Sequence, residues 1–207
     1  MGHAMNSAAF GPIFRLSLQT PREAAKHVIA IGLPERALWI ALSLVVVLTS
    51  LVMSGLMQVA PLQDDELSQV LALSPVYNYP LVLTAIRLGQ AVLAVFVLFW
   101  VGRALGGQGS KQDILGVLTL LQIVSFVLLT GISVVSMIFP LLSFVALVTF
   151  IGWLLWSVLT YVDEAHEFDN MFKATGVVLV SVIGVIIGMS LFLGLLSGLF
   201  VGSTSGV

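Results

Sequence analysis

One basic residue of this sequence lies inside a strongly apolar stretch, and a guanidinium in such surroundings has the chemistry of an anion binder. Arg87 stands in the stretch from Leu81 to Leu105, and Gln90 follows it three residues later. Helix residues three apart share a face, so both side chains are expected to point the same way. Such an arginine either pairs with an anion or extends to the lipid headgroups. We expect the second, because the apolar stretches contain no carboxylate; the run from Asp64 to Glu66 is the nearest candidate partner.

A second amide and one histidine are the other polar residues with possible chemistry. Gln122 lies about nine residues into another apolar stretch, and we expect it to hydrogen bond Gln90 between helices. His166 stands in an acidic segment from Asp163 to Asp169, at the three-residue spacing from Asp163 that can ligate a metal. A single such pair is too few ligands for a zinc site, so we expect no metal. We expect instead a solvated acidic connector that serves as a docking surface.

The sequence lacks the residues that several kinds of chemistry require. There is no cysteine, which excludes disulfides and thiol nucleophiles. No histidine and no carboxylate lies within the apolar stretches, so an intramembrane serine or aspartyl protease has no base or acid. The net charge of −2 argues against a nucleic-acid partner. We therefore expect no enzyme and no cofactor.

A long uncharged run indicates which secondary-structure elements position these residues. From Ile114 to Val162, 49 residues pass without Asp, Glu, Lys, Arg or His. As a helix this run would extend for about 74 Å, more than twice the roughly 30 Å hydrocarbon core of a bilayer. It must therefore cross a membrane twice, with a turn at Pro140.

The whole chain is 59% hydrophobic and only 9% charged, which is the composition of a membrane protein. We predict an all-α polytopic bundle with five transmembrane helices, because the segments are continuously apolar and do not alternate as barrel strands do. The five spans are Ala37 to Val59, Leu81 to Leu105, Ile114 to Ser136, Leu141 to Tyr161 and Ala174 to Leu196. The corresponding regions are an N-terminal arm (1–36), the transmembrane domain (37–199) and a short tail (200–207).

Basic residues predict the orientation. Seven of the eight lysines and arginines precede the first span or lie between spans two and three or four and five, and Arg87 is the exception. The positive-inside rule makes that side cytoplasmic. We expect the N-terminus in the cytoplasm and the C-terminus outside, in a bacterial inner membrane.

An amphipathic helix is predicted before the first span. Thr20, Pro21 and Glu23 have the spacing of a capping box with proline at the first helical position, and Pro34 is expected to end the helix. We expect this helix to lie in the headgroup region. The preceding segment from Phe10 to Leu18 is apolar enough to lie on the membrane or on another protein.

Small residues recur every four positions in the fifth span. Gly184 and Gly188 are one such pair, and Gly194 and Gly198 are another. This spacing lets two helix backbones approach closely. It indicates either an interface with a second copy or another protein, or packing inside this bundle, and the sequence does not separate the two.

The order of parts resembles the Yip family, multi-span proteins named for interaction with Rab-type GTPases. The resemblance rests on the amphipathic start, the five spans, the loop GRALGGQGSKQD (102–113) followed by LLQ (120–122), and the segment DEAHEFDNMFKATG (163–176), which looks like the bacterial branch. It implies an all-helical membrane domain that works through protein contacts, and it carries over no catalytic residue. Eukaryotic members have a long acidic and aromatic cytosolic arm, whereas about 35 residues precede the first span here.

Two functions remain after these exclusions. We expect a membrane scaffold or accessory protein that contacts lipid and other membrane proteins, a second copy included, through its spans and its cytoplasmic face. The alternative is a transporter or a protein that handles a lipid or small molecule with Arg87 and Gln90. Paired inverted halves are typical of transporters, and five unrepeated spans favour the scaffold.

Overall fold

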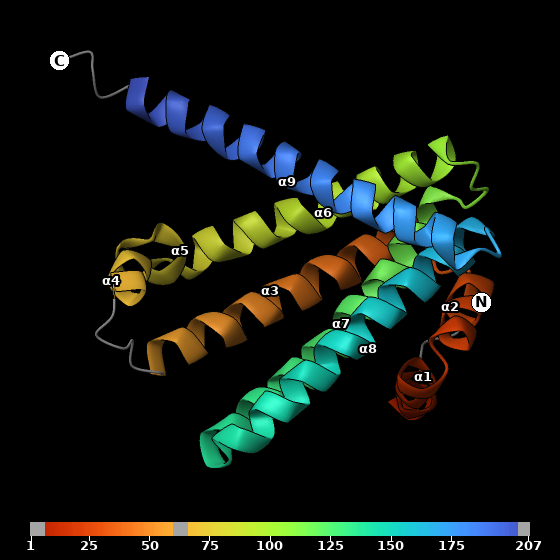
Figure 1. Ribbon diagram of the computed structural model, residues 1–207, viewed down its shortest axis with the longest axis horizontal. Coiled ribbons are helices and arrows are strands. Elements are labelled where there is room, and N and C mark those ends of the chain that lie inside the picture. Colours follow the sequence, from red (N-terminus) through yellow and green to blue (C-terminus); the bar gives the residue numbers. More distant parts are fainter. Residues whose placement is uncertain (1–6, 60–65, 203–207) are drawn as a thin grey trace.

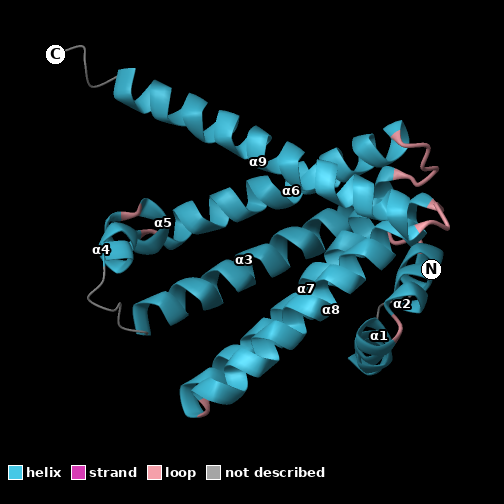
Figure 2. Ribbon diagram, viewed as in Figure 1, coloured by secondary structure: helices cyan, strands magenta, loops and turns pink. Residues whose placement is uncertain are grey.

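The computed structural model describes residues 7–59 and 66–202, and within them every regular element is a helix (Figures 1 and 2). The helices are α1 (Ser7–Gln19), α2 (Pro21–Ile31), α3 (Glu35–Val59), α4 (Glu66–Leu73), α5 (Pro75–Asn78), α6 (Pro80–Ala104), α7 (Lys111–Ile138), α8 (Pro140–His166) and α9 (Met171–Gly202). The all-α prediction is confirmed.

Five of these helices are long and apolar enough to cross a bilayer, namely α3, α6, α7, α8 and α9. They correspond one to one to the predicted spans. The largest differences from the predicted bounds are at the C-terminal ends of α8, which reaches His166 rather than Tyr161, and of α9, which reaches Gly202 rather than Leu196. The chain is thus a polytopic membrane protein, as its composition indicates.

The five spans form a fan whose members converge at one end and diverge towards the other (Figure 1). In the order of packing, α9 contacts α6, α6 contacts α3, α3 contacts α7, and α7 contacts α8. The central helix is α7. Half of the residues in its most apolar 18-residue stretch are buried inside the protein, against 11% for α8 and 17% for α9. We call the convergent end, where α2 and the connections 105–110 and 167–170 lie, the N-terminal end, and the opposite end the far end.

The two N-terminal helices pack on this chain. α2 contacts α8 and α7, and α1 contacts α2, while the Trp153 indole N–H donates to the Ser17 carbonyl at 3.1 Å. The predicted start of α2 at Pro21 is confirmed, but the capping box is wrong, because the Thr20 hydroxyl donates back to Leu16 instead. The predicted end at Pro34 is also wrong: Gly32, with φ +59°, ends the helix two residues earlier, in the left-handed conformation that glycine adopts readily.

The predicted turn at Pro140 is confirmed, and the start of α7 has a side-chain cap. Ser110 and Asp113 form a capping box at the start of α7, and Pro140 is the first residue of α8. At the far end, α4 and α5 occupy part of the connection between α3 and α6. There the Tyr77 hydroxyl donates to the Met57 carbonyl at 2.9 Å, which ties α5 to the end of α3.

The glycines of α9 pack against α6. A Cβ atom added at Gly184 would lie 3.0 Å from Val97, and one added at Gly188 would lie 2.7 Å from Leu93. These two glycines therefore serve the close approach of helices within one chain. A Cβ at Gly194 meets no described atom within 4 Å, and the surroundings of Gly198 lie outside what the structure describes.

We predict that Gly188→Leu weakens the packing of α9 on α6. The new side chain must displace Leu93, and overpacking of this kind costs about 1–3 kcal/mol. The measurement is thermal unfolding in a mild detergent. The matched control is Gly152→Leu in α8, where an added Cβ meets no described atom within 4 Å. Equal losses of stability in the two variants would contradict the assignment of Gly188 to this contact.

Candidate functional site

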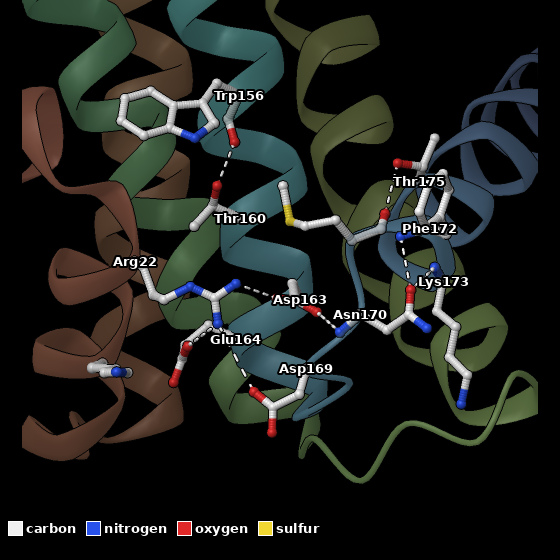
Figure 3. A network of polar contacts seen from close by, with 12 residues as sticks. Arg22, Trp156, Thr160, Asp163, Glu164, Asp169, Asn170, Phe172, Lys173 and Thr175 are labelled. Atoms are coloured by element: carbon white, nitrogen blue, oxygen red, sulfur yellow. Dashed lines mark hydrogen bonds and ion pairs between the residues drawn. The ribbon is translucent and has the colours of Figure 1, made fainter.

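The strongest polar contact at the N-terminal end joins α2 to α8. An Arg22 Nη atom lies 2.5 Å from a carboxylate oxygen of Asp163, and the other Nη lies 3.3 Å from Glu164 (Figure 3). The second Asp163 oxygen accepts the Asn170 backbone N–H at 3.0 Å. The Asp163 side chain is completely buried. A buried carboxylate is tolerated only when it is paired and hydrogen bonded, and Asp163 meets both conditions.

The connection between α8 and α9 places Asp163 for this role. α8 ends because Glu167 adopts a left-handed conformation with φ +54°, and the Phe168 N–H returns to the Asp163 carbonyl at 3.1 Å. Asn170 then starts α9, since its side-chain oxygen accepts the Phe172 N–H at 3.0 Å (Figure 3). Only four residues, 167–170, therefore separate the end of α8 from the start of α9. Both helix termini orient hydrogen-bonding groups around Asp163.

His166 occupies a separate niche on the α6 side of the same helix end. Its ring is buried, Nε2 lies 3.2 Å from the Leu98 carbonyl, and Phe168 stacks on it. The Gln108 backbone N–H donates to the His166 carbonyl at 3.0 Å, which fixes the connection between α6 and α7 to the end of α8.

Glycines of the 102–109 segment make room for this niche. A Cβ at Gly107 would lie 2.6 Å from His166 Nδ1, and one at Gly102 would overlap the ring. A Cβ at Gly109 would overlap the Ala165 carbonyl, which is backbone and cannot rotate away. The glycine-rich loop is thus explained by close packing against the end of α8.

These observations correct the expectation of a solvated segment around His166. Asp163 and His166 are buried and have different partners, so neither is available as a docking residue, and they do not form a metal pair. Within the described residues, no group of three or more potential metal ligands is present. Glu167 and Asp169 are the exposed acids of the connection. The pairing of Arg22 with Asp163 was not predicted from the sequence.

A cavity of about 330 Å³ lies among the five spans, and all five contribute to its lining. Its polar lining residues are Thr49 of α3, Arg87 and Gln90 of α6, Gln122 of α7 and Ser181 of α9. The rest of the lining is apolar, from side chains such as Val158 of α8. The three polar residues predicted inside the membrane therefore meet at one place.

In one respect the geometry of this cavity differs from the expectation. Among the hydrogen bonds of the described residues, none joins Gln90 to Gln122, although both line the cavity. Arg87 is half-buried and lines the cavity, and its extension to the lipid headgroups stays a prediction. Among the residues whose side chains the structure describes, Arg87 has no ion-pair partner. The side chains of the predicted partners, Asp64 to Glu66, lie outside that set.

We predict that Arg22→Ala destabilises the fold by about 2–3 kcal/mol, because it leaves the buried Asp163 carboxylate without its cation. Unfolding in detergent micelles measures the loss. Lys26→Ala is the matched control on the same helix: it removes an exposed pair with Glu23, worth at most about 0.5 kcal/mol, and a longer-range attraction to Glu164, but it leaves the Asp163 carboxylate paired. If Arg22→Ala is as stable as Lys26→Ala, the ion pair does not hold α2 in place.

Comparison with known proteins gives one match. The sequence model of the family described as the Yip1 domain matches residues 15–202, which is most of the chain and includes all five spans. No match is found among curated proteins or among solved structures.

Proposed function

Because the chain belongs to the Yip1 family, we propose that this integral membrane protein is a scaffold or accessory subunit that binds other membrane proteins. The observation that carries the proposal is the surface at the N-terminal end. It is formed by two segments 141 residues apart in sequence, which the ion pair between Arg22 and the buried Asp163 holds together. A polar surface fixed in this way is pre-organised for a partner, because little conformational freedom is left to lose on binding.

The side chains of this surface are suited to specific contact. Glu23, Lys26 and His27 of α2 are exposed, and so are Glu167 and Asp169 of the connection to α9. The ion pair between Lys26 and Glu23 adds little to the stability of the fold, since exposed pairs are screened by water and salt. Charges of this kind mainly select partners and accelerate association. The surface therefore carries mixed charges that the fold itself does not require.

The proposal includes an orientation. The fold places α2 and the connections 105–110 and 167–170 at one end, together with six of the eight lysines and arginines, and α9 runs to the other end (Figure 1). By the positive-inside rule we assign that end to the cytoplasm of a bacterial cell and the end of α9 to the outside of its inner membrane.

The test is purification from native membranes in a mild detergent, with the bound proteins quantified by mass spectrometry. We predict a partner in fixed stoichiometry that is lost in the double variant Glu23→Lys/Glu167→Lys, because charge reversal at both exposed positions makes the surface repel a complementary partner. Gln69→Lys is the control, an exposed change in α4 at the far end that should retain the partner.

Two results would contradict the scaffold role. In the first, the wild-type chain elutes with no stoichiometric partner in several native membranes. In the second, the partner is retained in Glu23→Lys/Glu167→Lys, which would place its binding site elsewhere on the protein.

A further inference from the structure

We propose that the cavity among the five spans binds an anionic amphiphile, whose charged head group is held by Arg87, Gln90 and Gln122 and whose hydrocarbon chain lies against α9. This inference concerns a ligand inside the membrane and does not depend on the scaffold role. It rests on the charge, the unused hydrogen-bonding groups, the apolar lining and the open side of the cavity.

The charge of the cavity selects an anion. Arg87 is half-buried in an apolar helix, and no carboxylate among the side chains that the structure describes lies within ion-pair distance of it. No Asp or Glu is among the residues that line the cavity. An uncompensated cation within a membrane costs several kcal/mol, so arginines in such places are usually paired. A ligand phosphate or carboxylate supplies the missing charge, and a guanidinium binds both groups in a two-point geometry.

The hydrogen-bonding groups around the cavity are also unsatisfied. The Ser181 side chain is buried, with 3% exposed, and its hydroxyl has no hydrogen-bond partner. By contrast, Thr49, which also lines the cavity, donates to the carbonyl of Val45 four residues earlier. The amides of Gln90 and Gln122 have no bond within the described residues either. Buried polar groups in native proteins are rarely left without partners, so the Ser181 hydroxyl indicates an occupant. The amides of Gln90 and Gln122, which are less buried, are available to bind it.

The remaining lining and the open side indicate a ligand with a hydrocarbon chain. Val182 and Ile186 line the cavity on α9 and are also exposed on the surface, as is Gln90. The cavity is therefore open to the surface of the bundle there, and in a membrane that surface faces lipid. A soluble anion would have to pass this apolar rim, whereas a lipid can enter sideways and leave its chain against Val182 and Ile186.

The size of the cavity agrees with a head group and not with a whole lipid. A volume of about 330 Å³ is at the lower limit of small-molecule sites. A phosphate or carboxylate with its first attached atoms fits beside Arg87, and the chain must extend through the open side. The guanidinium and the two amides therefore come from α6 and α7, whereas α9 supplies the Ser181 hydroxyl and the apolar contact for the chain.

The test uses the full chain in phosphatidylcholine nanodiscs that contain a minor fraction of phosphatidylglycerol or of oleate, each carrying a photoactivatable group in its acyl chain. We predict cross-linking to α9 near Val182 and Ile186 by at least one of the two anionic probes, and at least tenfold less by a phosphatidylcholine probe. Which anionic probe labels the site distinguishes a phosphate from a carboxylate head group. Competition by free inorganic phosphate at millimolar concentration would indicate a soluble anion site and would overturn the proposal.

Variants separate this site from general attraction to anionic lipid. Arg87→Gln keeps a polar side chain but removes the charge, and it should reduce labelling about tenfold or more. Arg103→Gln, near the exposed end of the same helix, should not. Ala94→Phe fills the cavity without removing any donor, and it should also abolish labelling. Unchanged labelling in Arg87→Gln, or a loss in Arg103→Gln equal to that in Arg87→Gln, would overturn the proposal.

Both cavity variants are compared with the wild type by gel filtration and thermal unfolding without probe. The wild type should gain thermal stability when the anionic probe is added, because a ligand that binds only the folded state stabilises it. Arg87→Gln should not gain it. If the wild type shows no gain at probe concentrations that saturate labelling, the labelling is non-specific and the cavity is not a binding site.

Discussion

The buried carboxylate of Asp163 is the constraint on which the arrangement of this bundle depends. A charge with no access to water must be paired, and the pair comes from Arg22, which lies outside the five spans. Asp163 thereby fixes α2 to the end of α8, and its second oxygen fixes the start of α9. Three elements are held by one side chain.

Other polar contacts gather at the same end. His166 holds the connection between α6 and α7 through its carbonyl, Lys111 of α7 pairs with Glu35 of α3 at 2.7 Å, and Gln112 donates to the Leu33 carbonyl. All five spans are therefore linked by polar groups at the N-terminal end. In lipid there is no hydrophobic driving force between helices, so such contacts and close packing decide where helices stay together.

The divergence of the spans follows from this distribution. Away from the N-terminal end, α9 remains on α6 through Gly184 and Gly188, while α8 remains on α7. The two pairs separate, and the polar-lined cavity lies between them and α3. The same fold thus gives a rigid charged surface at one end and an opening towards lipid within the membrane.

The spans were predictable because an apolar run of known length is a local property of the sequence. So was the turn at Pro140, because proline acts on its own helical turn. The pairing of Arg22 with Asp163 was not, since it joins residues 141 positions apart and either residue alone reads as a solvated charge. Nor was the role of Gly102 and Gly107 visible, because it depends on the position of a histidine on another helix. The polar residues of the cavity were identified, but their convergence required the packing of all five spans.

The most direct test of this account is hydrogen exchange of the wild-type chain in lipid nanodiscs, read at the backbone amides of Gln108 and Asn170. Both lie outside the helices, and they donate to the His166 carbonyl and to the Asp163 carboxylate. If the polar contacts at the N-terminal end hold the spans together, both amides exchange far more slowly than in an unfolded chain. Exchange of both at the unfolded rate would show that this end is not fixed, and the account would be wrong.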